Sequence, residues 1–340
     1  MEFHVTQTRR PGPTAPATGL EAAEARLSAE RTVPCGWVHK HAVEQVLVTD
    51  VREIDGRFFA LAQLPRTHRL YNDSHDAGYD VLLLGEVARQ ASEAMVHRLM
   101  GVPLDRPFVI GTMRVEVLDR AAVAVTRAAT TVLAEFVVKR AKRWPDGTPR
   151  HLLSSTILHI GGVPAADFSG TLMMLKGDTY RALREDGAVP SAGAPAHRRT
   201  GEPRATPEEV GRNDPRNVVV GGLREENEGI TADLVVDLDD PVFFDHELDH
   251  LPAMLLLEGA RQSALAALAR RDGVPARSLS AVDCTVNFHQ FAELGAPVTC
   301  TAVPDGAGTV AVQLVQGDDV IAEGGITLVT GNGPATGTAD

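Results

Sequence analysis

The chain has 340 residues, 44% of them hydrophobic, which is enough for one large domain or two medium ones with real cores. Its formal net charge of −12 argues against nonspecific binding to nucleic acid, whose phosphates an acidic surface repels. No apolar run is long enough to predict a membrane span. The three cysteines (Cys35, Cys284 and Cys300) form no CxxC pair, so we expect neither disulfides nor zinc, and a reducing cytoplasm fits best.

Residues 1–30 lack an apolar signal core and are rich in Pro, Thr and Gly, which predicts a disordered N-terminal segment. The first unit, residues 31–183, opens with a predicted strand at 43–51. Asp55-Gly56 is a typical hairpin turn, and the strand RFFALA follows it. The second unit, residues 213–330, opens in the same way with strands at 216–222 and in GITADLVVD.

A polar loop then leads into one long helix in each unit. Apolar periodicity predicts these helices at 80 to about 100 and at 252 to about 271. Gly101 and Gly273 stand where a left-handed C-terminal cap belongs.

About three long β-like runs follow each helix. They are FVIGTMRVEVL, AVTRAATTVLAEFVVKR and HLLSSTILHI in the first unit, and LSAVDCTVNF, PVTCTAV with TVAVQLVQ, and DVIAEGGITLV in the second. One helix among about five strands cannot make alternating βαβ units. The order predicts an α+β fold in which an antiparallel sheet curls around a single helix. Residues 184–212 (Pro, Gly, Ala and charge) read as a mobile linker, and residues 331–340 as a disordered tail.

The two units read as a tandem duplication. The helices contain VLLLGEVARQAS (81–92) and AMLLLEGARQSA (253–264), in which Glu86 and Glu258 are 258 − 86 = 172 positions apart. The arginines and glutamines of this trio keep the same offset, as do 46–48 with 218–220 and YND with FFD; the four residues are Arg89, Arg261, Gln90 and Gln262.

Each charged trio projects from one helix face, because positions i, i+3 and i+4 lie together. A charge among so many leucines is costly unless it is paired or used. A purely structural ion-pair network between the packed helices therefore stays open as an alternative to a functional site.

The loops before the helices differ between the units. The second unit has His246 and His250, flanked by Asp245 and Asp249, just ahead of its helix. The first has Ser74 and Gly78 at the corresponding positions, with only His75 nearby. This difference favours one working site and one repurposed site. No further histidine has ligand-like spacing, so we expect no metal.

The run FFDHELDHLPAMLLLEGARQ resembles the hotdog-fold signature of fatty-acid dehydratases, with Ala253 where those enzymes have a turn glycine. Three motifs together, RTVPCGWVHKHAVEQVLVTDV, VLLLGEVARQ and DHxxDHxPxMLLLEGARQ, resemble the A-factor synthase family of bacterial signalling enzymes, from about Arg31 to Val329. The resemblance implies a tandem hotdog: two curved antiparallel sheets, each wrapping one long central helix, arranged as a pseudo-dimer.

The same resemblance implies an acyltransferase. It moves a β-ketoacyl chain from acyl carrier protein onto the hydroxyl of dihydroxyacetone phosphate, giving a precursor of γ-butyrolactone or butenolide signals, and it uses no cofactor. In the hotdog fold a site combines a loop histidine of one unit with a helix glutamate of the other. We therefore expect Glu86 to face His246 and His250, the two trios to meet across the pseudo-twofold axis, and Glu258 to be the structural partner.

The predicted chemistry needs a base, an oxyanion site and a cation for phosphate. Glu86, with a pKa raised by its apolar helix, or a loop histidine could be the base. Backbone N–H groups near Met254 could bind the oxyanion, and Arg261 and Arg89 the phosphate. We expect the catalytic residues to be Glu86, His246, His250 and Arg261, supported by Arg89, Gln90, Asp245, Met254, Glu258 and Gln262. No GxSxG or cysteine nucleophile pattern occurs, so direct transfer is favoured.

The run Val137–Arg150 concentrates five cations, including those of Lys139–Arg143, and Trp144-Pro145-Asp146-Gly147 is a predicted turn within it. It could dock a carrier protein or its phosphopantetheine phosphate, or be a solvated hairpin. A hotdog dehydratase or thioesterase acting on acyl-ACP or acyl-CoA, a non-catalytic acyl-binding protein, and a homodimer of pseudo-dimers also stay open.

Overall fold

The computed structural model describes residues 19–73, 77–187, 203–226 and 228–330. The elements of the first half are α1 (Gly19–Glu24), η1 (Cys35–Val38), η2 (Val43–Gln45), β1 (Val48–Ile54), β2 (Arg57–Leu64), α2 (Val81–Met100), β3 (Phe108–Val117), β4 (Thr130–Arg143), β5 (Pro149–Ile160), β6 (Val163–Met174) and α3 (Gly177–Gly187). Those of the second half are η3 (Pro207–Val210), η4 (Pro215–Asn217), β7 (Val220–Glu226), β8 (Gly229–Leu234), α4 (Ala253–Asp272), η5 (Ala276–Ser278), β9 (Leu279–Phe288), β10 (Val298–Pro304), β11 (Thr309–Gln316) and β12 (Asp319–Thr330).

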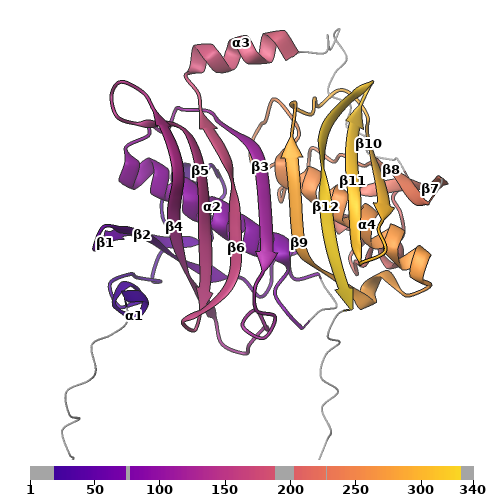
Figure 1. Cartoon of the computed structure of the whole chain (residues 1–340), viewed down its shortest axis with the longest axis horizontal. Coiled ribbons are helices and arrows are strands. Elements are labelled where there is room, and N and C mark those ends of the chain that lie inside the picture. Colours follow the sequence, from indigo (N-terminus) through magenta and orange to yellow (C-terminus); the bar gives the residue numbers. More distant parts are fainter. Residues whose placement is uncertain (1–18, 74–76, 188–202, 227, 331–340) are drawn as a thin grey trace, which may run out of the picture.

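The two predicted sheets are joined into one. The strand order is β1-β2-β4-β5-β6-β3-β9-β12-β11-β10-β8-β7, a 12-stranded sheet in which every pair is antiparallel. The two halves join where β3 pairs with β9, from Thr112 opposite Asn287 to Glu116 opposite Asp283. Each half curls around its own helix, α2 or α4, and the two helices also contact each other (Figure 1). The expected α+β double hotdog is therefore confirmed.

Both central helices begin and end where the sequence predicts. Asp80 is the N-cap of α2, and its carboxylate accepts a hydrogen bond from the N–H of Leu82 at 2.8 Å. Gly101 and Gly273 close the two helices at φ values of 72° and 65°, in the left-handed region that glycine enters without strain. No described helix is both long enough and apolar enough to cross a membrane.

The duplication extends further than the sequence motifs indicate. Adding 172 to the bounds of η1, η2, β1 and α2 gives the bounds of η3, η4, β7 and α4. Residues 207–212, which we assigned to the linker, are thus the counterpart of residues 35–40. The part of the predicted linker between 188 and 202 lies outside the described residues, as do residues 1–18 and the tail from 331.

Three local expectations differ from the structure. Part of the first predicted strand, Val43–Gln45, is the short helix η2, and β1 begins only at Val48. Strand β6 was not predicted, although it lies centrally between β5 and β3. Within the predicted disordered segment, residues 19–24 form α1, and Ala23 packs against Ile54 and Phe59.

Candidate active site

Each central helix carries a buried glutamate that accepts hydrogen bonds from the arginine and the glutamine of its own trio. In α2, Arg89 donates two hydrogen bonds to the carboxylate of Glu86, at 2.8 and 2.7 Å, and Gln90 donates one at 2.8 Å. In α4, Arg261 donates in the same way to Glu258 at 3.0 and 2.7 Å, and Gln262 also donates to it. Among the described residues no hydrogen bond or ion pair joins the two trios, so the expectation that they meet directly across the pseudo-twofold axis is wrong.

The two glutamines hold the chain that precedes the first strand of each unit. The amide of Gln90 accepts from the N–H of Leu47 at 2.8 Å and donates to the C=O of Gln45 at 2.8 Å. Gln262 makes the matching pair of bonds with Val219 and Asn217, at 2.9 and 2.7 Å. Because both glutamines are fully buried and make equivalent bonds, their contribution here is structural.

The residues around Glu258 form a buried network of ion pairs. Arg212 donates to the Glu258 carboxylate at 2.7 and 3.1 Å, and both side chains are almost completely buried. Asp80, from the start of α2, lies 3.8 Å from Arg212 and 3.6 Å from Arg261. Two carboxylates thus face two guanidiniums here, and Arg261 makes no contact with Glu86 or His246 among the described residues.

The site around Glu86 is built differently. Its counterpart of Arg212 is Lys40, whose ammonium lies 3.6 Å from a Glu86 oxygen. Its counterpart of Asp80 is Pro252, which brings no charge, and Arg89 pairs instead with Glu93 of its own helix at 2.6 Å. Because Asp80 faces Arg261, the pseudo-twofold symmetry predicts that the start of α4, with Ala253 and Met254, faces Arg89. The first N–H groups of a helix have no acceptor within the helix, so they are available to a substrate there.

Two loops from different units meet beside Glu86. Asp245 accepts hydrogen bonds from the N–H groups of His41 and Ala42, at 2.7 and 3.1 Å. Asp73 accepts the equivalent bonds from Asn213 and Asp214, at 3.0 and 3.1 Å. This pair of contacts joins the units in both directions, and in the first it brings His246 to residues 39–42.

Asp245 and His246 form an acid–imidazole dyad. Nδ1 of His246 lies 2.8 Å from the Asp245 carboxylate, and its ring stacks on that of His41 with centroids 4.4 Å apart. Burial raises the pKa of Asp245, but the N–H donors of His41 and Ala42 and the His246 bond outweigh burial and hold that pKa below its usual range. An ionised Asp245 keeps the proton of His246 on Nδ1, which leaves Nε2 as the acceptor.

A second histidine beside this site is held in a fixed tautomer. Nδ1 of His97 lies 2.8 Å from the C=O of Val102 and must donate, so Nε2 of His97 accepts from Nε2 of His39 at 2.7 Å. The unprotonated nitrogen of His39 is then Nδ1. Burial first, then the charges of Arg89 and His246, lower the pKa of His39 to about 4.

In the described part of the chain, no hydrogen bond, ion pair or ring contact joins His250 to the residues around Glu86. Its Nδ1 contacts Asp249 at 2.6 Å, and its ring meets the edge of Phe291 at 4.8 Å. Tyr180, on α3, donates to the same Asp249 carboxylate at 2.9 Å. The structure therefore brings together His246 and the Glu86 site but does not add His250 to them. Ser74 and His75 of the first unit lie outside the described residues.

The predicted protonation of Glu86 is wrong. Burial does raise its pKa, but the charges of Arg89 and Lys40 and the hydrogen bonds of Arg89 and Gln90 outweigh burial and lower that pKa to about 2. Glu86 is thus an ionised group and a poor base. The acid whose pKa is raised is Glu93, mainly by burial, with Arg89 opposing and Glu86 adding to the rise.

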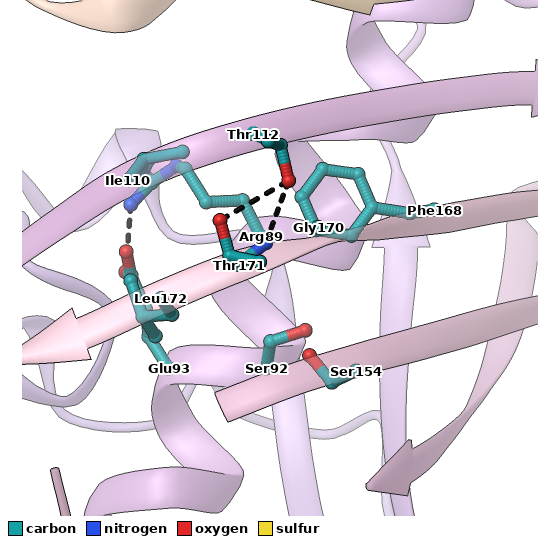
Figure 2. Close-up of a pocket in the computed structure, with 10 residues that line it drawn as sticks. All are labelled: Arg89, Ser92, Glu93, Ile110, Thr112, Ser154, Phe168, Gly170, Thr171 and Leu172. Carbon is teal, nitrogen blue, oxygen red and sulfur yellow. Dashed lines mark hydrogen bonds and ion pairs between the residues drawn. The ribbon is translucent and has the colours of Figure 1, made fainter. Parts of the chain in front are cut away.

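A cavity of about 30 Å³ begins at the charged side chains of Arg89 and Glu93 and lies between α2 and strands β3, β5 and β6. Figure 2 shows Arg89 and Glu93 at one side and the bonded hydroxyls of Thr112 and Thr171, 3.1 Å apart, at the other. The volume holds about one water molecule. Arg89 is paired with Glu86 and Glu93, and Arg261 with Glu258 and Asp80. Neither guanidinium is free to bind phosphate, contrary to our expectation.

Sequence reasoning missed several residues of this site. Lys40 and the histidines on either side of it lie in the VHKH segment, where the family resemblance predicted no role for individual residues. His68 lies close enough for the charges of Glu86 and Lys40 to act on its pKa. In the second unit the counterparts of His39 and His68 are Gly211 and Asp240, so the histidines also distinguish the two sites.

Comparisons with known proteins agree with this architecture. The family model described as "A-factor biosynthesis hotdog domain" matches residues 22–176 and 194–330. A 2-oxo-3-(phosphooxy)propyl 3-oxoalkanoate synthase of Streptomyces virginiae is 30% identical over 80% of this chain and 87% of its own length. The enzyme of that name from Streptomyces coelicolor is 29% identical over 93% of this chain and 97% of its own length.

Among solved structures, the dehydratase domain from the CurF module of curacin polyketide synthase is 12% identical and aligns with a TM-score of 0.48, over 83% of this chain and 96% of its own. The family model covers both halves of the chain, each built around one central helix. The chain belongs to the A-factor biosynthesis hotdog domain family.

Proposed function

We propose that the protein transfers a 3-oxoacyl chain from a carrier-bound thioester to the hydroxyl of dihydroxyacetone phosphate. The name of its relatives, 2-oxo-3-(phosphooxy)propyl 3-oxoalkanoate synthase, describes the ester of these two parts. The observation that carries the proposal is the Asp245–His246 dyad, which reaches across the unit boundary to the loop next to Glu86. The thioester donor on acyl carrier protein, and a reaction without a cofactor, are parts of the same proposal.

In this mechanism Nε2 of His246 takes the proton of the acceptor hydroxyl. The hydroxyl oxygen forms a bond to the thioester carbonyl carbon, and the carbonyl oxygen becomes an oxyanion that the N–H groups of Ala253 and Met254 bind. The C–S bond then breaks, and the departing thiolate takes the proton back from His246. No residue is acylated, which agrees with the lack of a nucleophile pattern in the sequence.

The charged residues around the dyad position the substrates. Lys40 has donors beyond the one that faces Glu86, and it takes the phosphate role that we first gave to Arg89 and Arg261. Glu86 holds Arg89 and Lys40 in place. The acyl chain runs toward Ile110, Phe168 and Leu172, the apolar part of the cavity lining, and widens that cavity by displacing side chains. The three free thiols, Cys35, Cys284 and Cys300, fit a cytoplasmic enzyme.

The reaction is tested by mixing the purified chain with a β-ketoacyl carrier protein and dihydroxyacetone phosphate and following all products by mass spectrometry. We expect a phosphorylated ketoester to form as the carrier loses its acyl group. Release of free 3-oxo acid, or formation of an enoyl product, without any ester would replace the transferase by a thioesterase or a dehydratase.

The site is tested with two single histidine variants. His246→Ala should lower kcat by about 10²–10⁴-fold, because a positioned general base contributes about that much. His250→Ala is the matched control, since His250 also pairs with an adjacent aspartate but contacts Phe291 rather than the loop of His41 and Ala42. Equal losses in the two variants, with both proteins folded, would rule out His246 as the base.

A further inference from the structure

A cluster of cations surrounds Trp144 at one end of the first half of the sheet. Lys176 Nζ lies 4.9 Å from the centroid of the Trp144 ring, and the guanidinium carbons of Arg150 and Arg106 lie 5.7 and 5.9 Å from it. Arg143 is next to Trp144 and donates to the C=O of Gly147 in the same hairpin. Four cations therefore gather within one small area of a chain whose net charge is −12.

The chain itself supplies little negative charge to balance these cations. Among the described residues, no carboxylate forms an ion pair with Arg106, Arg150 or Lys176. Asp146, in the same turn, is fully exposed: it accepts hydrogen bonds from Thr148 at 2.9 and 2.6 Å, which with the charges of Arg106 and Lys176 lower its pKa. The indole N–H of Trp144 is buried and has no acceptor among the described residues. Several cations packed against the Trp144 ring, next to an indole N–H without an acceptor, favour the binding of an anion from another molecule.

The second half of the protein has the same hairpin without this cluster. Trp144-Pro145-Asp146-Gly147 joins β4 to β5, as the sequence predicts, and its turn is closed by the N–H of Trp144 bonding to Thr148 at 2.8 Å. In the hairpin between β10 and β11 the equivalent bond joins the N–H of Asp305 to Thr309 at 2.7 Å, so Asp305 stands in the place of tryptophan. The turn therefore forms without the aromatic residue, and Trp144 is not required by the hairpin.

The cluster lies at the end of the strands that line the cavity beside Arg89. Phe108 pairs with Met174 where β3 begins and β6 ends, so Arg106 and Lys176 flank that pair just outside the sheet. Ile110 and Leu172, two residues further in, line the cavity. Arg150 lies at the outer end of β5, where the pairing with β4 is irregular, four residues before Ser154, which also lines the cavity.

The distance from the cluster to the cavity suits a flexible arm. A strand rises about 3.3 Å per residue, so Ser154 lies about 13 Å along β5 from Arg150. The phosphopantetheine arm of a carrier protein carries a phosphate at one end and the thioester at the other, and it is longer than this. A phosphate at the cluster would thus allow the thioester to reach the row of Glu93 and Arg89.

We propose that Trp144 and the cations Arg106, Arg143, Arg150 and Lys176 form the docking site for the acidic surface of an acyl carrier protein, with the phosphate of its prosthetic arm among the cations. The assignment rests on the proposed function only for the nature of the donor. Of the two interpretations of the Lys139–Arg143 run, a docking site or a solvated hairpin, the proposal favours the docking site and centres it on the end of that run.

The test is a double charge reversal, Arg150→Glu with Lys176→Glu, at two exposed side chains. Calorimetry with holo carrier protein should show a Kd raised at least about tenfold, and the KM for the acylated carrier should rise in parallel. The KM for dihydroxyacetone phosphate, and the rate with an acyl N-acetylcysteamine thioester that has neither protein nor phosphate, should not change. Arg277→Glu is the matched control, because Arg277 precedes β9 by two residues as Arg106 precedes β3, and it is exposed.

Unchanged carrier affinity in the double variant, or no carrier binding by the unmodified protein, overturns the docking site. A rise in the KM for dihydroxyacetone phosphate alone also overturns it, because the cluster would then bind the acceptor. Carrier binding that depends on the cluster but leads to no ester supports the docking site while rejecting the proposed transferase.

Discussion

Replacing Glu258 by alanine should destabilise the protein far more than replacing Glu86, although the two acids occupy equivalent positions. Glu258 is fully buried and bonds to Arg212 and Arg261, whose side chains are 1% and 8% exposed. Without it, two buried guanidiniums keep only Asp80, at 3.8 and 3.6 Å, as a counter-charge. In the Glu86→Ala variant, by contrast, Arg89 keeps the carboxylate of Glu93.

The magnitude follows from the cost of leaving a buried charge without its partner, which is about 3–5 kcal/mol. We expect a loss of that size in the free energy of unfolding for Glu258→Ala. For Glu86→Ala we expect less than half of it, because Arg89 keeps Glu93 as a partner and the Lys40 side chain, at 13%, is more exposed than those of Arg212 and Arg261. A loss of 3–5 kcal/mol raises the unfolded fraction by about 10²–10⁴-fold.

Urea unfolding of both variants measures the difference, with the free energy taken from the midpoint at an unchanged slope. Ester formation by the folded fraction is assayed in parallel, and Glu86→Ala should lose activity even where it is fully folded. Glu258→Gln is the control for side-chain volume and should be intermediate in stability. Equal stability losses in Glu258→Ala and Glu86→Ala would falsify the assignment of Glu258 to structure and of Glu86 to the working site.

Three further outcomes are expected. Burial, the largest cause in each case, lowers the pKa of His39 and of His68 from 6.5 to about 4, so the unfolded chain binds more protons than the folded chain between these pH values. The free energy of unfolding should therefore fall as pH decreases through that window, by up to about 1.4 kcal/mol per pH unit for each histidine. Urea titrations at several pH values measure this fall. His39→Gly should fold, because His39 has a φ of 51° and its counterpart Gly211 a φ of 70°, and a flatter pH dependence of stability would be the check. Gln90→Ala and Gln262→Ala should each cost several kcal/mol, since each leaves one buried N–H and one C=O without a partner, and unequal losses in denaturant titrations would contradict their equivalence.

The fold was predictable because its strongest signals are local or repeated. The apolar helices, their glycine caps and the offset of 172 positions needed no tertiary information. Strand β6 was missed because VPAADFSGTLMM has proline at its second position and contains Asp, Ser and Gly without clear alternation. It is a strand because β5 and β3 on its two sides satisfy its backbone hydrogen bonds, and no local pattern carries that information.

The site was predictable only in part, because its charges are paired over long sequence distances. His246 was found through its adjacent aspartate and its place before the helix. The pKa of Glu86 was misjudged because its neighbours in sequence are leucines, whereas its neighbours in space include Lys40, 46 residues away. Arg212 was placed in a linker for the same reason, since its partner Glu258 is also 46 residues distant.

The fusion of the two units changes what selection can act on. In a dimer of identical chains, any substitution would appear in both sites at once, so a lysine suited to substrate could not coexist with an arginine suited to locking the core. Here Lys40 and Arg212 occupy equivalent positions in one chain and have diverged, as have Pro252 and Asp80. One half can therefore stabilise the fold, and the other remains free to adapt to new acyl chains without a loss of stability of the whole chain.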